Sequence, residues 1–591
     1  MRVAPPLDAS STGAGVPETR ELTARALATG VALGALLAPC NVYSGLRIGW
    51  SFNMSIIALL ASIALWRPLA RAFGLRDWNR LESNIGQTTA SSAASIVSGG
   101  LVAPIPAYTL ITGQQFALAP LIAWVFAVSL LGIWVAWYLR PALVGPASQL
   151  RFPEGLATLE TLLDVFAHGA EASRRIAALG LAALLSAATR WVDTFVLLLP
   201  RWTPVEGLAR FTFVFEPSWL LAGFGAIIGL RVGLSLFAGA LLAWGFIAPR
   251  IAGTVVPLPK GEAGESIDAA ASLFGPLVEW LLWPGVSLMV GATLSSFAVG
   301  LWRTRSANSA RSLSWPAIGD APLPALAFAG AALLTVLLQR LLFGIDWWIA
   351  LLAVPLAVML ATVAARVVGD TGIPPIGAIG KVSQLSFGLA APGQAVTNLM
   401  TANVAGGAAG QCADLMNDFL VGRGIGASPA RQAVAQSVGV VTGSVVGAIV
   451  YLTLIPDPAA MLLTEQWPAP AVATWKAVAE AMAHGLDSVP ASARAAMMIA
   501  LLVGAIAGVL EASLPARFAR RLPSATAFGL AFVIPASISI TMTAGALAAA
   551  AFAAVVPSLA ARLTIAIAAG LVTGESLVGV FAAFAEWAGV A

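Results

Sequence analysis

The sequence predicts an all-α polytopic membrane protein with about 16 transmembrane or half-spanning helices in two duplicated halves with re-entrant segments. Three observations support this fold class. The 591 residues are 59% hydrophobic and only 10% charged, whereas soluble globular proteins carry roughly 25% charged residues. The long Leu, Ala and Val runs lack the alternation of a β-barrel strand. The two halves of the chain also share a weak internal repeat.

Apolar runs mark the membrane-spanning segments, since each spanning helix needs about 20 apolar residues. They lie near 22–39, 51–66, 119–138, 176–199, 218–248, 276–302, 321–343, 347–367, 431–455, 492–511, 524–556 and 562–590. Between them lie segments rich in small and polar residues, at 83–118, 153–170, 370–418 and 470–487. We expect these four segments to be re-entrant or half-spanning helices within one large membrane domain.

The placement of arginines predicts the orientation of the chain. The clusters are Arg20 and Arg25; Arg67, Arg71, Arg76 and Arg80; Arg303, Arg305 and Arg311; and Arg517, Arg520 and Arg521. The positive-inside rule assigns such clusters to the cytoplasm. Both termini are therefore expected to be cytoplasmic, and the polar segment 1–20 is expected to be a disordered cytoplasmic tail.

The internal repeat divides the chain into two predicted units. Pro217-Ser218 recurs at 523–524, and the Gly-Ala-Leu string at 239–241 recurs at 545–547. The string at 83–95 also resembles that at 397–410. We therefore expect an N-terminal transmembrane half at 21–310 and a C-terminal half at 311–591. Duplicated halves with small-residue segments at matching places are typical of carriers whose site lies where the halves meet.

Composition excludes several other functions. The net charge of +4 comes mostly from Arg-rich loops, so we expect no nucleic-acid partner. Two cysteines, Cys40 and Cys412, and two histidines are too few for a disulfide framework or a Cys/His metal site. The chain has no GxxxxGK[ST] motif for ATP. We expect no catalytic residues, no metal and no cofactor, and hence no enzyme.

The most informative stretch is 370–418, because it is polar yet lies between segments apolar enough to span a bilayer. Polar groups at membrane depth are expensive and usually serve a substrate or ion path. The predicted substrate-binding residues here are Lys381, Gln384, Asn398, Thr401 and Asn403, and the predicted proton-coupling residues are Asp370, Asp414 and Asp418. Charged Asp370 and Lys381 side chains are tolerated at membrane depth only if they form an ion pair or contact water. Asp414 and Asp418 share a helix face, where they could share a proton; the alternative is that they cap a helix beside Arg423.

Two N-terminal strings supply further substrate-binding candidates. Over 38–52, Pro39 and Gly45 are expected to break a helix and to expose Asn41, Tyr43 and Arg47 to an anionic substrate group; the alternative is a short loop with Arg47 reaching the headgroups. The run Asn84, Gln87 and Thr88 could bind substrate or could simply tie packed helices together.

Two carboxylates complete the candidate list. Arg151 and Glu154 begin the string RFPEGLATLETL and could form a cytoplasmic gate, or Glu154 could belong to the solvated edge of an interfacial helix. Glu575 lies in the middle of the last apolar segment. It could carry a proton, or it could be a tie between helices.

At these strings the chain resembles the oligopeptide transporter (OPT) family. The matching strings are NVYSGLRIGWSF, RFPEGLATLETL, GDTGIPPIGAIGKVSQLSFG, TANVAGGAAGQCADLMNDF with GASPARQ, and GLVTGESLVGV. They run in family order from about 22 to 590. The resemblance implies a proton-coupled carrier of peptides, peptide-like molecules or metal chelates. Lacking the long acidic N-terminal extension and SPY-type motif of the peptide branch, the chain resembles the yellow-stripe-like branch and prokaryotic members more closely.

The sequence therefore predicts a proton-coupled symporter whose partners are a peptide or metal-chelate substrate, protons and the lipid bilayer; it leaves homo-oligomerisation open. The Ala-, Arg- and Gly-rich composition indicates a bacterial inner membrane. A channel or facilitator is the alternative. An intramembrane aspartyl protease is disfavoured, because Val367 stands where the GxGD motif would begin.

Overall fold

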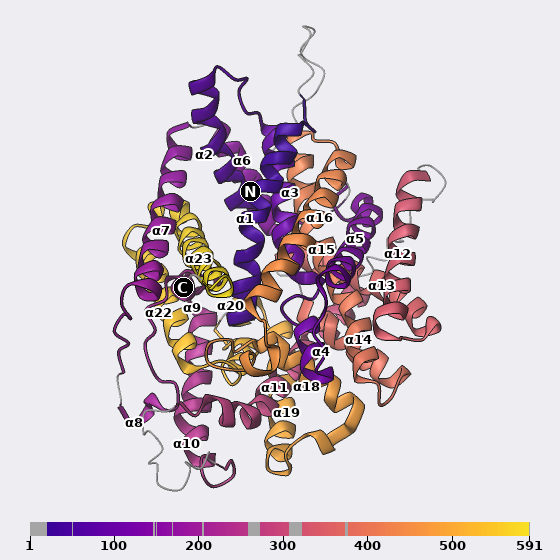
Figure 1. Cartoon of the computed structure of the whole chain (residues 1–591), viewed down its shortest axis with the longest axis vertical. Helices are drawn as coiled ribbons and strands as arrows, with labels where there is room; N and C mark the ends of the chain where they lie inside the picture. The colour runs from indigo at the N-terminus through magenta and orange to yellow at the C-terminus, as the bar shows by residue number, and fades with distance from the viewer. Residues whose placement is uncertain are drawn as a thin grey trace.

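The computed structural model describes residues 20–589 apart from 50, 52, 146–147, 149, 168, 204–205, 258–271, 307–321, 373–375 and 520. These residues are mostly helical and include no β-strand, which confirms the all-α class. Thirteen of their helical segments are long and apolar enough to cross a membrane, so the polytopic prediction is also confirmed. Several long helices, among them α1, α2 and α12, follow the long axis of the molecule (Figure 1).

The helices up to residue 306 are α1 (Ala24–Ile48), α2 (Ser55–Phe73), α3 (Arg80–Ala94), η1 (Ser95–Gly99), α4 (Pro104–Thr112), α5 (Leu118–Leu143), α6 (Pro153–Ala167), α7 (Gly169–Phe195), α8 (Glu206–Ala209), α9 (Trp219–Ala240), η2 (Leu241–Ile247), α10 (Ala248–Ile251) and α11 (Phe274–Ser306). Those from residue 322 onward are α12 (Pro322–Phe343), α13 (Trp347–Thr371), α14 (Ile376–Ala390), α15 (Ala395–Ile425), α16 (Pro429–Leu454), α17 (Pro458–Met461), α18 (Pro470–His484), η4 (Gly485–Ser488), α19 (Ala491–Ser513), α20 (Ala516–Ala519), α21 (Ala525–Leu530), α22 (Ala536–Val555) and α23 (Pro557–Trp587).

The predicted helix break over 38–52 is wrong in its position. Helix α1 begins where the Thr23 side chain accepts a hydrogen bond from the Ala26 N–H, and it continues through Pro39 and Gly45. It ends at Gly49, whose φ of 76° is in the left-handed region. In a bilayer an unpaired backbone group costs several kcal/mol. A helix that continues past one proline loses few backbone hydrogen bonds, whereas a break in the helix would leave many backbone groups without a partner.

The predicted half-spanning character of 370–418 is also wrong for most of that segment. Only α14 is short; α15 is one continuous helix of 31 residues, about 46 Å long at 1.5 Å per residue. Small residues dominate its middle, and their burial in protein removes the need for an apolar surface. By contrast, α6 and α18 have 15 residues each. At about 22 Å they are too short to cross a hydrocarbon core of about 30 Å.

Two matching junctions hold the first residues of α6 and α18. The Phe152 N–H donates to the carbonyl of Gly369 at 2.8 Å, and the Ala469 N–H donates to the carbonyl of Leu46 at 2.9 Å. Phe152 and Ala469 have φ of 45° and 42°, which is strained for residues other than glycine. Both precede the proline that opens the short helix. The end of α13 therefore supports the start of α6, and the end of α1 supports the start of α18.

The central helices pack in a reciprocal pattern as well. Helix α3 lies against α1 and α16, while α15 lies against α13 and α5. A Cβ added to Gly443 of α16 would lie 2.5 Å from the Ala93 carbonyl of α3, and one added to Gly132 of α5 would lie 2.5 Å from the Ala408 carbonyl of α15. Such close approach needs glycine at the contact. The two contacts correspond to one another in the sequence. Gly443 lies about as many residues after Gly132 as Ala408 lies after Ala93.

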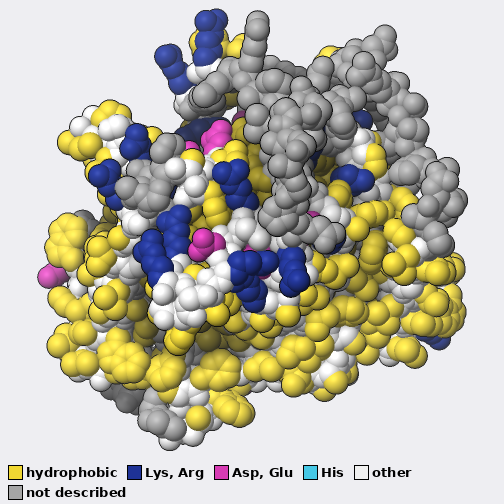
Figure 2. All heavy atoms as spheres, turned by 90° about the horizontal axis from the view of Figure 1, so that it is seen from above, with side chains coloured by type: hydrophobic (Ala, Val, Ile, Leu, Met, Phe, Trp, Pro, Cys, Tyr) yellow, Lys and Arg dark blue, Asp and Glu magenta, His cyan; other side chains and the backbone are white. Residues whose placement is uncertain are grey.

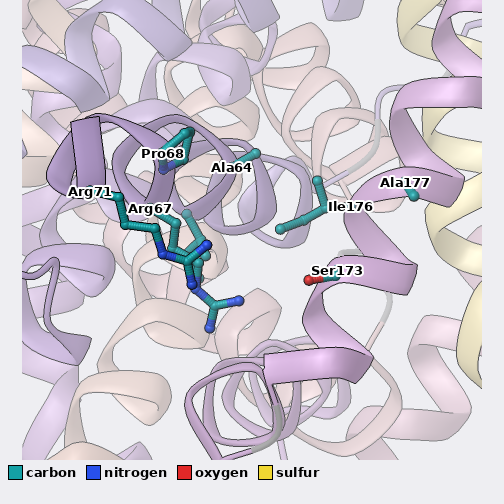
Figure 3. Close-up of a pocket in the computed structure, with 8 residues that line it drawn as sticks. Ala64, Arg67, Pro68, Arg71, Ser173, Ile176 and Ala177 are labelled. Atoms are coloured by element: carbon teal, nitrogen blue, oxygen red, sulfur yellow. The ribbon is translucent and has the colours of Figure 1, made fainter.

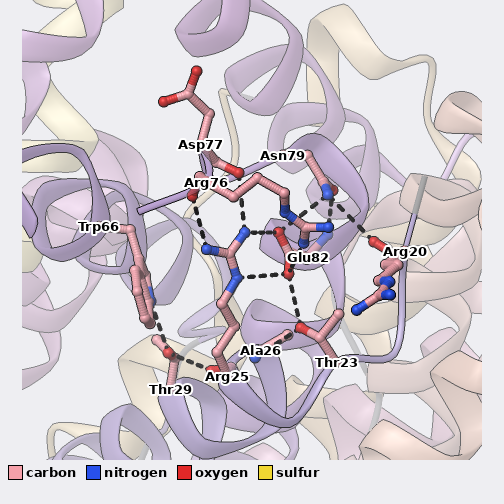
Figure 4. Close-up of polar contacts among 10 residues, drawn as sticks. All are labelled: Arg20, Thr23, Arg25, Ala26, Thr29, Trp66, Arg76, Asp77, Asn79 and Glu82. Atoms are coloured by element: carbon pink, nitrogen blue, oxygen red, sulfur yellow. Dashed lines mark hydrogen bonds and ion pairs between the residues drawn. The ribbon is translucent and has the colours of Figure 1, made fainter. Parts of the chain in front are cut away.

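Basic side chains gather on one end of the molecule, at the top of Figure 1, while hydrophobic side chains cover its flanks (Figure 2). At this end the buried Glu82 carboxylate binds Arg25 at 2.5 Å and Arg76 at 2.8 Å and accepts a hydrogen bond from Thr23. Asn79 caps α3 and donates to the same carboxylate (Figure 4). This network fixes the first turn of α1 to that of α3. The predicted tail, except Arg20, and the predicted boundary at 310–311 lie outside the described residues.

Candidate carboxylate site at the junction of α3, α6, α15 and α16

Asp414 of α15 is buried among uncharged hydrogen-bond donors from three other segments. Ser91 of α3 donates to its Oδ1 at 3.2 Å, and Gln436 of α16 donates to its Oδ2 at 3.1 Å. Asn53, just before α2, reaches Oδ1 at 3.5 Å. Ser55 of α2 donates to Ser91 at 3.0 Å and so supports the first of these donors. The carboxylate therefore joins α15 to α2, α3 and α16.

Asp418 lies one turn further along α15 and is bound in the same manner. Gln87 of α3 donates to its Oδ1 at 3.0 Å. The Gln87 amide also contacts Asn84 and Thr88, so the predicted amide group of α3 forms one cluster with this carboxylate. The Oδ2 atom of Asp418 is buried and has no hydrogen-bond partner among the described residues, and neither has the Gln87 Oε1. One proton or cation could therefore bind at these two acceptor atoms.

Glu154 of α6 extends the site. The Asn417 side chain donates to Glu154 Oε2 at 3.4 Å and accepts from the Gly155 N–H at 3.2 Å. Burial, and after it the negative charge of Asp414, raises the pKa of the Glu154 carboxyl to about 7, while a hydrogen bond with Asn53 lowers it. Glu154 therefore titrates near neutral pH, and its charge depends on that of Asp414.

None of these three carboxylates takes part in an ion pair of the described residues. A buried carboxylate without a cationic partner is costly in its charged form, since amides and hydroxyls repay only part of the lost hydration. A bound proton or cation relieves that cost. The alternative that Asp414 and Asp418 cap a helix beside Arg423 does not fit, because α15 continues to Ile425 and Arg423 donates to the carbonyls of 144 and 145.

The amides at 398–403 form a separate group. The Asn398 side chain donates to the Gln384 carbonyl, Gln384 donates to the Trp475 carbonyl at 3.0 Å, and Asn403 accepts from Trp124 at 2.7 Å. Thr401 donates to carbonyls of its own helix. Asn398 and Asp414 are 16 residues apart on α15, or about 24 Å. The structure thus brings 84–88 together with 414–418 and not with 398–403.

Asp370 and Lys381 are not an ion pair within the described part of the chain. Asp370 is exposed near the end of α13, whereas Lys381 is buried in α14 and donates to the Gly377 carbonyl at 3.3 Å. The predicted Pro374-Pro375 break between them lies outside the described residues. Arg151 has an exposed side chain, and its backbone N–H donates to the Gly369 carbonyl.

A second charged cluster joins α1, α9 and α23. Arg47 binds Glu216 at 3.0 Å. Burial acts to raise the pKa of Glu216, but the charge and hydrogen bond of Arg47, with more distant arginines, outweigh burial and lower that pKa. Glu575 accepts from the Ser218 hydroxyl at 2.7 Å and from the Leu220 N–H at 2.8 Å. It therefore binds the N-terminus of α9, where the helix dipole favours a negative charge.

Tyr43 and Asn41 lie nearby on α1. The Tyr43 ring packs against Trp467 with centroids 5.4 Å apart, and a Cβ added to Gly579 of α23 would lie 2.6 Å from that ring. Asn41 donates to the Ala94 carbonyl at the end of α3 at 3.0 Å. Both side chains are buried. They tie α1 to its neighbours on either side.

Sequence reasoning missed four contributors: Asn53, Ser91, Gln436 and Glu216. Gln432 and Gln436 stand four apart in the mostly apolar α16, and that spacing on one face could have indicated a polar contact. Glu216 precedes the Pro217-Ser218 start of α9, where an acidic residue is ordinary. No group of three or more His, Cys, Asp or Glu among the described residues could hold a metal ion.

The helical bundle and its buried, amide-bound carboxylates define a multi-pass membrane protein of the kind that transports solutes. The chain belongs to the OPT oligopeptide transporter protein family, whose model matches residues 21–586. It is therefore a transporter and not an enzyme.

Three relatives cover most of this chain. The chain is 25% identical over 630 residues to a probable metal-nicotianamine transporter of Oryza sativa subsp. japonica, with 95% of this chain and 89% of the relative covered. It is 24% identical to the iron-phytosiderophore transporter yellow stripe 1 of Zea mays (94% and 89% covered). It is 22% identical to a putative oligopeptide transporter of Saccharomyces cerevisiae (78% and 81% covered).

Proposed function

We propose that this transporter is a proton-coupled symporter of peptide-like or metal-chelate compounds, and that Asp414 and Asp418 bind the coupling proton. One observation carries the proposal: both carboxylates are buried beside uncharged donors and belong to no ion pair of the described residues. Glu154 is the third member of the site and links it to α6. Because α6 begins at a strained junction on α13, a change of charge here can alter how α6 is held.

The chemistry of the site favours a proton over a fixed salt bridge. Two carboxylates one turn apart cannot both be charged without strong repulsion, so they can share one proton. Gln87, Gln436 and Ser91 can each reorient to donate to a carboxylate or to accept from a carboxylic acid. The site can therefore gain and lose a proton without breaking the helix packing around it.

The substrate is proposed to bind nearer the group formed by Gln384, Asn398, Thr401 and Asn403. Buried amides can bind peptide bonds or chelate oxygens, and the buried Lys381 ammonium suits a carboxylate. Similarity to a probable metal-nicotianamine transporter and to an iron-phytosiderophore transporter favours a metal chelate as the substrate of this protein. Such chelates carry carboxylates. Arg47 is a weaker candidate for this role than the sequence suggested, because Glu216 already binds it.

Alternating access is proposed to use the duplicated halves, 21–310 and 311–591. The reciprocal helix contacts and the matched junctions at Phe152 and Ala469 support a duplication. A rocking motion of one half against the other would bend the chain at these two junctions first. The Arg-rich end would face the cytoplasm of a bacterial cell, with both termini there.

Proteoliposome uptake tests the proposal. Vesicles containing pyranine and the purified transporter are given nickel–nicotianamine, or a tetrapeptide, with and without an inside-alkaline pH gradient. A symporter accumulates one of these probes faster with the gradient, acidifies the lumen as it does so, and shows trans-stimulated exchange. Uptake that ignores the gradient and shows no trans-stimulation would instead support a channel or facilitator.

A further inference from the structure

We propose that a pocket between α2 and α7 binds the phosphate group of an anionic glycerophospholipid. The cavity measures about 630 Å³ and is lined by Ile63, Arg67 and Arg71 of α2 and by Ser173, Ile176 and Ala177 of α7, among others. It shares no residue with the carboxylate site, although Ser55 at the start of α2 belongs to that site. Figure 3 shows both arginine side chains extending from α2 into the space that faces Ser173.

The two arginines suit a phosphate. They stand four residues apart and therefore on one face of α2. Arg67 Nη2 donates to the Val165 carbonyl at the end of α6 at 2.8 Å, which fixes its position while leaving other N–H groups of the guanidinium to donate. Neither arginine belongs to an ion pair of the described residues. An arginine pair without a carboxylate partner favours phosphate oxygens.

The surface next to the pocket indicates a lipid as the source of that phosphate. Leu181, Leu184 and Leu185 of α7 are 68%, 67% and 52% exposed, and Leu181 lies one turn beyond Ala177. Leu65 of α2 is 46% exposed. A basic pocket between spanning helices with such an apolar surface beside it can hold a headgroup and its acyl chains together. A free phosphate would use only the arginines.

Native mass spectrometry of the detergent-purified transporter tests this site, with phosphatidylglycerol as the anionic probe and phosphatidylcholine as the zwitterionic one. We expect the wild type to retain phosphatidylglycerol in preference to phosphatidylcholine. The double variant R67Q/R71Q should lose about 30-fold of that preference, taking about 1 kcal/mol for each basic group near a lipid phosphate. The matched control R20Q/R80Q removes the same charge from exposed arginines outside the pocket and should keep the preference.

A second variant guards against misfolding, because R67Q also loses the contact with α6. Ala177→Trp fills the pocket and keeps both arginines, and it should also lower retention of phosphatidylglycerol. Glycerol 3-phosphate should fail to displace the bound lipid, since it lacks acyl chains. Equal retention of the two lipids by the wild type, an unchanged preference in both R67Q/R71Q and Ala177→Trp, or displacement by glycerol 3-phosphate would overturn the proposal.

Discussion

Replacing Glu154 by Gln should stabilise the protein at high pH and have little effect at low pH. The pKa of Glu154 is raised from its ordinary value of 4.5 to about 7. The folded state therefore favours the protonated carboxyl, and the associated stability is present below pH 4.5 and is lost as pH rises through 7. At about 1.4 kcal/mol for each pKa unit, the charged form costs the folded state about 3 kcal/mol. Gln is a permanent uncharged substitute of similar shape, so it avoids that cost.

The assay is thermal unfolding of the purified transporter at pH values of about 5 and about 8, on either side of the relevant pKa. The apparent Tm of the wild type should fall more than that of Glu154→Gln between the two conditions. Glu160→Gln is the matched control, because Glu160 lies on the same helix with an exposed side chain. An equal fall of the apparent Tm in the wild type and in Glu154→Gln would refute the raised pKa of Glu154. A Glu154→Gln variant less stable than the wild type at the higher pH would refute it as well.

Three further substitutions test the packing and the second charged cluster. Gly225→Ala should cost about 3 kcal/mol, because its Cβ would lie 1.8 Å from a carbonyl oxygen of α22; Gly330→Ala, with open space around it, should leave the apparent Tm unchanged or higher. Glu575→Gln should cost about 2 kcal/mol through one lost contact with the α9 N-terminus yet keep gradient-driven uptake, and loss of coupling with unchanged Tm would make Glu575 a proton carrier instead. Arg47→Gln should cost about 3 kcal/mol because it leaves Glu216 buried without its partner, and an unchanged Tm would show that the pair contributes little.

The helical class and the shared helix face of Asp414 and Asp418 could be predicted from sequence. Hydropathy identifies spanning helices because the bilayer forbids unpaired backbone, and carboxylates four apart must share a helix face. The partners of those carboxylates could not be predicted, since Gln436 and Ser91 approach from other helices. The resemblance between the strings at 83–95 and 397–410 did not indicate that Gln87 contacts Asp418.

Local helix-breaking signals misled the prediction in two places. Pro39 and Gly45 are unfavourable in an isolated helix, yet α1 continues through both because burial against α3 and α16 outweighs propensity. The glycines of α15 suggested an interruption, whereas the structure uses small residues for close helix contacts. The strained junctions at Phe152 and Ala469 had no sequence signal beyond the proline that follows each of them.

Proton coupling through Asp414 and Asp418 is tested by recording proton and substrate fluxes together in proteoliposomes containing the wild type, Asp414→Asn or Asp418→Asn. Nickel–nicotianamine uptake and pyranine fluorescence give the ratio of protons to substrate in one experiment. We expect each variant to keep substrate exchange but to lose proton movement and gradient-driven accumulation. An unchanged proton-to-substrate ratio in both variants would contradict the claim that these buried carboxylates carry the coupling proton.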